Sequence, residues 1–224
     1  MRLVFYSSEV CRQNRLLDRE LLNLAALVSP RMTYVPFSSL EDESYYEEWK
    51  AHFQRYGVQE FNYFALDARF SKSTVDNFFA SDIIYISGGN TYALLQGLRK
   101  SELAPRFLSF VKKGGVLAGA SAGAIIMTPT IGTAAIPSVD RDHNEARLRN
   151  LKSLGIVPFE FSPHYEYHFK SDEELKRYSL RIKRPIYASP DGGGIVVNGN
   201  SLRFVGACVR YQGGRRKEIR STGN

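Results

Sequence analysis

A short segment between two apolar runs most constrains the fold of this chain. The residues G-A-S-A-G at 119–123 follow a strand-like run at 115–118 and open a helix-like run at 122–127. A G-x-S-x-G segment between a strand and a helix is typical of a nucleophile elbow, whose tight turn pushes the serine out of the sheet. The helix that follows would direct free N–H groups at Ser121, which favours negative charge there. The alternative is a turn that needs glycine only for close packing.

The order of segments around this turn predicts an α/β fold. Strand-like runs are found at 3–7, 32–37, 63–66, 82–87, 115–118, 156–161 and 186–188. Helical patterns are found at 15–27, 44–56, 73–80, 91–99 and 105–112. Such alternation predicts a mostly parallel central sheet with helices on both faces. Asn198-Gly199 between the apolar runs 195–197 and 202–204 predicts a C-terminal antiparallel hairpin.

The pattern is looser after the serine. We expect a loop at 129–141 and a helix at 144–154. Ser171, followed by Glu174 three residues later, has the spacing of a capping box and predicts a helix that runs to Lys183. No repeat or linker divides the chain, so we expect a single domain over 1–210 followed by a basic, partly disordered tail at 211–224.

Composition narrows the classes of function. The 224 residues contain 24% charged and 43% hydrophobic residues, and no apolar stretch approaches the roughly 20 residues that cross a bilayer. The N-terminus lacks the features of a secretory signal, and Cys11 and Cys208 match neither a disulfide framework nor zinc spacing. We therefore expect a cytoplasmic protein without a membrane partner. The net charge of +7 comes with no nucleic-acid-binding motif, so we expect no nucleic-acid partner.

A serine nucleophile needs a base, and the base needs an orienting group. His164 follows a proline turn at the carboxyl end of a predicted strand, which is the edge where open α/β sheets bind ligands. We expect His164 to be the base, with His168 and His143 as alternatives. His52 lies in a charged helix and is expected on the surface.

The orienting carboxylate should also follow a strand. Asp191 comes directly after the run 186–188, although an aspartate before glycines is also common in turns. Asp140 and Glu166 are alternatives for this role.

The segment S-G-G-N-T at 87–91 could supply an oxyanion hole, because glycines expose backbone N–H groups. We expect the N–H groups of Gly89 and Ala122 to form it, while Asn90 could equally serve as a helix N-cap. His164 and His168 stand four apart, as zinc ligands on a helix do, but no third ligand is evident. We therefore expect no zinc site there.

Together these segments resemble the aspartyl dipeptidase (peptidase E) family of serine peptidases. The resemblance lies in I-S-G-G-N-T at 86–91, G-A-S-A-G-A at 119–124, I-P-S-V-D at 136–140 and S-P-H-Y at 162–165. It implies a fold similar to class I glutamine amidotransferase domains, with serine in place of their cysteine. It also implies a triad of Ser121, His164 and Asp191 that works with no metal and no cofactor. The best-known members carry glutamate at the last position.

The expected function is therefore that of a serine peptidase acting on small peptides through an acyl-enzyme. The resemblance implies dipeptides with N-terminal aspartate, with Asn90 and Asp140 near the substrate. A cation should then pair with the substrate carboxylate, for which Lys170, Lys176 and Arg177 are candidates. An esterase or amidase with the same triad and a non-catalytic binding protein are the alternatives, and a homodimer is left open.

Overall fold

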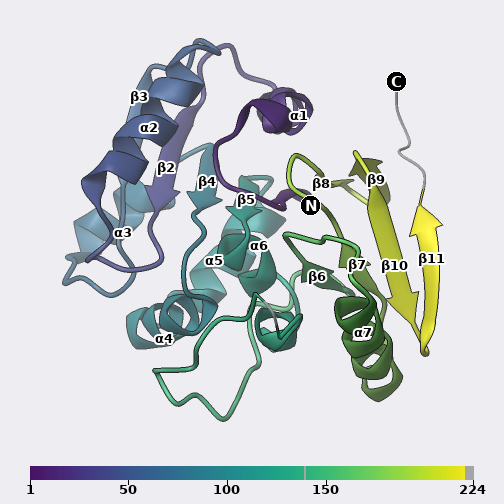
Figure 1. Cartoon of the computed structure of the whole chain (residues 1–224). Coiled ribbons are helices and arrows are strands. Elements are labelled where there is room, and N and C mark those ends of the chain that lie inside the picture. Colours follow the sequence, from purple (N-terminus) through teal and green to yellow (C-terminus); the bar gives the residue numbers. More distant parts are fainter. Residues whose placement is uncertain (139, 220–224) are drawn as a thin grey trace.

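The computed structural model describes residues 1–138 and 140–219 and arranges them around two β-sheets (Figure 1). The larger sheet has seven strands among these residues, in the order β3-β2-β4-β5-β1-β8-β9. Its strands are β1 (Arg2–Tyr6), β2 (Arg31–Val35), β3 (Glu60–Tyr63), β4 (Ile83–Ile86), β5 (Val116–Ala120), β8 (Gly194–Asn198) and β9 (Ser201–Val205). The strands from β3 to β1 in this order are parallel, and β8 and β9 add an antiparallel edge.

Helices cover both faces of this sheet. They are α1 (Arg15–Ala25), α2 (Glu43–Gln54), α3 (Lys72–Phe78), α4 (Thr91–Ser101), α5 (Ala104–Lys112) and α6 (Ala122–Ile126), with short 3-10 turns η1 (Arg12–Asn14) and η2 (Gly132–Ala135). Successive residues of a strand face opposite sides. On β1, Leu3 and Phe5 therefore pack with α3 to α6, while Val4 and Tyr6 pack with α1 and α2. The expected α/β class, with a mostly parallel central sheet between helices, is confirmed.

A second sheet follows, with four strands in the order β11-β10-β7-β6 within the described residues. The strands are β6 (Glu160–Ser162), β7 (Ile186–Ala188), β10 (Cys208–Gln212) and β11 (Arg215–Ile219), and the helix α7 (Phe169–Arg181) packs on them. Leu175 of α7 contributes to a small core with Ile186 and Tyr211. The parallel pair β6 and β7 directs two carboxyl ends toward the larger sheet.

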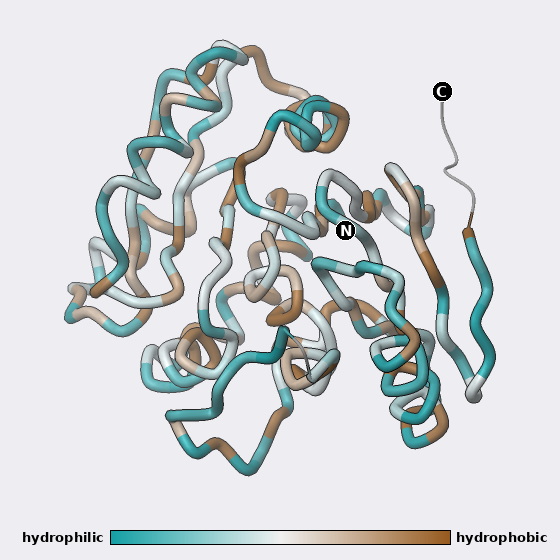
Figure 2. The backbone as a smooth tube through the Cα atoms, viewed as in Figure 1, coloured by the Kyte–Doolittle hydropathy of each residue, from teal (hydrophilic) through white to brown (hydrophobic). Residues whose placement is uncertain are grey.

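The hairpin predicted around Asn198-Gly199 is present as β8 and β9. The disorder expected from residue 211 onward is wrong as far as residue 219. These residues complete β10 and form β11. Gly213 and Gly214 have φ angles of 56° and 75°, which suit the tight turn between the two strands. Figure 2 shows β11 as hydrophilic along most of its length, as is typical of a protected edge strand. Residues 220–224 lie outside the described residues.

Other expectations fail for local reasons. No helix forms at 144–154, because Arg147 has a φ of 53° and the side chain of Asn144 bonds to both the N–H and the C=O of Leu148. α7 begins at Phe169 with His168 as its N-cap, so Ser171 is not the cap.

The strand expected at 63–66 lies earlier in the chain, because β3 spans Glu60–Tyr63. The strand expected at 156–161 is only the short β6. Among the described residues, no helix combines the length and the apolar composition that a bilayer crossing requires.

Candidate active site

Ser121 lies in a strained turn between β5 and α6. Its φ of 48° and ψ of −110° are unusual for a residue with a side chain. A Cβ atom on Gly119 would overlap the backbone of Gly123, and one on Gly123 would overlap the carbonyl of Ile86. Glycine is therefore required for close packing, and the same packing presents the serine at the edge of the sheet. The close-packing interpretation of the G-x-S-x-G segment therefore holds, and the strained turn is compatible with a nucleophile elbow.

The imidazole of His164 lies beside this serine. Nε2 of His164 is 2.8 Å from Oγ of Ser121, and Nδ1 is 2.7 Å from Oδ1 of Asp191. Because a carboxylate only accepts hydrogen bonds, the neutral ring carries its proton on Nδ1 and accepts the serine hydroxyl at Nε2. The aspartate thus reaches the ring, although it is one methylene shorter than glutamate.

Residues from both sheets form this site. Ser121 follows β5 of the larger sheet, whereas His164 and Asp191 follow β6 and β7 of the smaller one. The carboxyl ends of these strands meet at one edge, as expected for the ligand-binding edge of an α/β sheet.

The other carboxylates considered for the triad lie near His164 but do not bond to it. Within the described residues, neither Asp140 nor Glu166 forms a hydrogen bond with His164. His168 caps α7, and Nε2 of His52 is 2.9 Å from the buried Asp18.

The segment after β4 lies next to the elbow, since the N–H of Gly123 donates to the carbonyl of Ser87 at 3.0 Å. Gly89 has a φ of 109°, and a Cβ atom there would overlap the ring of Phe37. Within the described part of the chain, the N–H groups of Gly89 and Ala122 donate to no other residue, so both are free to bind an oxyanion.

Asn90 has a clear structural role. Its Oδ1 accepts the N–H of Ala93 at 2.9 Å as the N-cap of α4, and its Nδ2 donates to the carbonyl of His143 at 3.0 Å. The N-cap interpretation of the glycine segment therefore holds, and Asn90 is absent from the residues that line the cavity beside Ser121.

Glu9 contacts the glycine segment after β4, and sequence reasoning missed it. Burial raises the pKa of Glu9 to about 7, while the hydrogen bond that its carboxylate accepts from the N–H of Gly88 opposes this and nearby Glu41 adds to it. The available signal was its position just after β1, at the same edge as the other strand ends. The carboxylate of Glu9 therefore lies directly against Gly88 of the glycine segment.

Two cavities flank His164. One, of about 490 Å³, is lined by Ser121, Gly89, Asp140 and Asp142 among others. The second, of about 730 Å³, is bordered by Asp140, Glu166 and Asp191. The segment 136–140 contributes to both cavities, although Val139 lies outside the described residues. The cavities are large enough for a small peptide and carry acidic groups.

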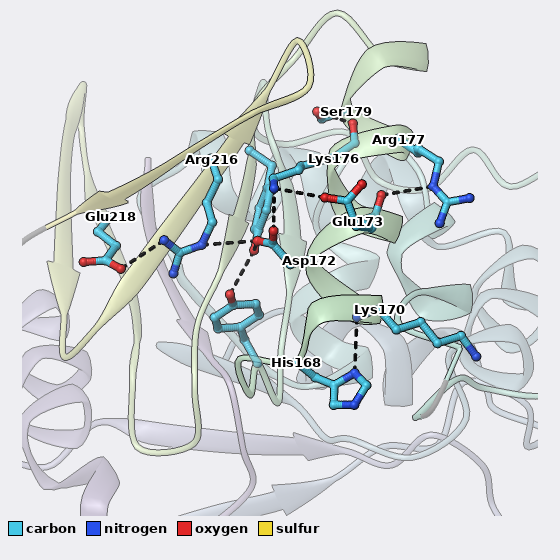
Figure 3. Close-up of polar contacts among 11 residues, drawn as sticks. His168, Lys170, Asp172, Glu173, Lys176, Arg177, Ser179, Arg216 and Glu218 are labelled. Atoms are coloured by element: carbon cyan, nitrogen blue, oxygen red, sulfur yellow. Dashed lines mark hydrogen bonds and ion pairs between the residues drawn. The ribbon is translucent and has the colours of Figure 1, made fainter.

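The cations proposed for a substrate carboxylate are held elsewhere or lie apart. Figure 3 shows Lys176 directed at Asp172 and Glu173. Its Nζ lies 2.7 Å from Oδ2 of Asp172 and 3.1 Å from Oε1 of Glu173. Nε of Arg177 donates to the carbonyl of Glu173 at 3.2 Å. Among the described residues that line the two cavities there is no lysine or arginine, so Lys170 is not among them either.

The described residues contain no group of three or more histidine, cysteine, aspartate or glutamate side chains arranged to hold a metal ion.

Comparisons with known proteins identify relatives of this chain. An uncharacterized peptidase of Listeria innocua is 31% identical over 140 residues, which are 60% of this chain and 64% of the relative. Peptidase E of Pasteurella multocida is 25% identical over 191 residues, which are 82% of this chain and 78% of the relative. The matched region thus spans less than two thirds of the Listeria innocua protein.

A crystal structure of a putative peptidase E protein from Listeria monocytogenes EGD-e has a similar fold. Its TM-score is 0.72 at 22% identity, over 91% of this chain and 97% of that one. The resemblance to peptidase E is therefore confirmed. A family model described as Peptidase family S51 matches residues 3–205. The chain belongs to peptidase family S51.

Proposed function

We propose that the protein is a serine peptidase that hydrolyses small peptides through Ser121, His164 and Asp191. The observation that carries this proposal is the unbroken hydrogen-bond chain from the serine hydroxyl through the imidazole to the carboxylate, at 2.8 and 2.7 Å. Serine, base and orienting acid in this order can activate the hydroxyl as a nucleophile.

In the proposed reaction, Oγ of Ser121 attacks the scissile carbonyl while Nε2 of His164 takes its proton. The N–H groups of Gly89 and Ala122 hold the negative oxygen of the tetrahedral intermediate. His164 then gives its proton to the leaving amine, which departs and leaves an acyl-enzyme. Water, activated by the same imidazole, releases the acyl group and restores the serine. Asp191 keeps the ring oriented and stabilises its charged form throughout.

The substrate we propose is a small peptide, and the resemblance narrows it to dipeptides with N-terminal aspartate. The carboxylate of Asp140 lies beside both cavities and suits the ammonium group that every such dipeptide carries. The described residues that line the two cavities include no lysine or arginine to pair with the aspartate side chain of such a substrate. Substrate preference must therefore be measured against neutral and basic N-terminal residues.

The test is a dipeptide panel with aspartate, alanine or lysine at the N-terminus, scored by released amino acid, together with a simple phenyl ester. Wild type, Ser121→Ala and the exposed control Ser44→Ala are compared, and each is labelled with a fluorophosphonate. We expect wild type and Ser44→Ala to cleave dipeptides and to be labelled, and Ser121→Ala to do neither. Equal turnover by Ser121→Ala would overturn the proposal, and turnover of the ester alone would indicate an esterase.

A further inference from the structure

Ser7 is a buried side chain that the proposed mechanism does not use. It follows β1, its side chain is inaccessible to solvent, and its hydroxyl contacts the two turns that carry His164 and Asp191. Oγ accepts the backbone N–H of His164 at 2.7 Å and donates to the carbonyl of Ser189 at 2.7 Å. Oδ1 of Asp191 lies 3.4 Å from the same oxygen.

The two turns need such support. His164 has a φ of 52°, a conformation that side-chain-bearing residues adopt only when their surroundings hold them there. The side chain of Asp191 is 60% exposed, so packing alone does not fix it. A residue that binds the backbone of both turns can fix the position of the His164 imidazole relative to the Asp191 carboxylate.

Ser7 also connects these turns to the nucleophile. The residue before it, Tyr6, accepts the backbone N–H of Ser121 at 3.0 Å through its carbonyl oxygen. The N–H of Ser7 donates to the carbonyl of Gly193 at 3.0 Å. The end of β1 therefore lies between the elbow of the larger sheet and the two turns of the smaller sheet.

We propose that Ser7 is a positioning residue that holds His164 and Asp191 at the distance from Ser121 that proton transfer requires. The inference rests on the proposed function, since it concerns the geometry of the same triad. A hydroxyl has one proton to donate and two lone pairs to accept with, which matches one bond to Ser189 and one from His164. Losing it would free both turns without touching the substrate. Misplacement of about 1 Å can cost on the order of a hundredfold in rate.

The experiment compares Ser7→Ala with Ser162→Ala. Ser162 is a matched control, because it is equally buried on β6, and its hydroxyl has no hydrogen-bond partner among the described residues. Both variants are checked for folding by circular dichroism, and kcat and KM are measured on the best dipeptide. We expect Ser7→Ala to lose roughly 10- to 100-fold in kcat with KM within about twofold of wild type, and Ser162→Ala to keep both values.

Ser7→Cys keeps a side chain of similar shape, but its thiol forms only weak hydrogen bonds. It therefore tests the positioning role of Ser7 if Ser7→Ala does not fold. Its expected loss in kcat is smaller but of the same kind. A kcat within twofold of wild type in the folded Ser7 variants, a rise in KM alone, or an equal loss in Ser162→Ala would overturn the inference. Wild-type turnover that depends on Ser121, combined with any of these results, would leave the proposed function standing.

Discussion

Glutamine in place of Glu9 should remove a loss of stability that the wild type suffers as the pH rises. Burial raises the pKa of Glu9 from 4.5 to about 7 in the folded protein. Below pH 4.5 the Glu9 side chain is protonated in both the folded and the unfolded state, so it does not lower the free energy of unfolding. Between pH 4.5 and about pH 7 the folded state keeps a proton that the unfolded state releases, so stability falls as the pH rises. Above about pH 7 the loss of stability is complete.

The structure sets the size of this effect. Raising the pKa of Glu9 from 4.5 to about 7 corresponds to about 3 kcal/mol, at about 1.4 kcal/mol for each tenfold change in proton affinity. Glutamine is neutral at every pH, and its side-chain oxygen can still accept the N–H of Gly88. At pH 8 the Glu9→Gln variant should therefore be about 3 kcal/mol more stable than wild type, with a much smaller difference at pH 5.

The assay is urea unfolding at intervals from pH 5 to pH 8.5. The free energy of unfolding of wild type is subtracted from that of Glu9→Gln at each pH, which removes the contribution of all other groups that titrate alike. Glu145→Gln, at an exposed position, is the control and should show no trend. A difference that stays constant across the range, or that matches the control, would refute the assignment of a buried, proton-binding Glu9.

Further predictions concern the triad, a buried ion pair and metals. Asp191→Asn should lower kcat on the order of 10³- to 10⁴-fold because it disturbs the orientation of His164, whereas Asp140→Asn should act chiefly on KM; the reverse ranking in steady-state kinetics would move the orienting role to Asp140. Arg184→Ala should cost about 3 kcal/mol in urea unfolding, because it leaves Glu160 buried and without its cation, and an unchanged midpoint would contradict this. Incubation with EDTA should leave turnover unchanged, while a loss that zinc restores would indicate a metal enzyme.

Much of the fold could be predicted because its signals are local. Buried parallel strands are continuous apolar runs, and the glycine turn at Gly199 is readable from neighbouring residues. β11 was missed because its side chains are charged and it gains stability from backbone pairing with β10, which leaves no hydrophobic pattern. The helix expected at 144–154 failed because one asparagine side chain competes for the backbone.

The candidate site divides in the same way. Ser121, His164 and Asp191 could be named because each follows a strand, and carboxyl ends of parallel strands meet at one edge. Their catalytic roles stay a prediction. Ser7 could not be found, because its contacts depend on β1 lying between β5 and β8, and that order is set by pairings between distant parts of the chain.

The pairing of β1 with β8 has a consequence for how activity appears in time. The first strand of the chain remains half unpaired until residues 194–198 have been synthesised and have folded against it. Contacts between such distant segments form slowly, because a long loop must close first. When the protein refolds after dilution from denaturant, turnover should therefore return only as β8 pairs with β1. It should lag behind the recovery of helical signal, even though the elbow itself is a local structure.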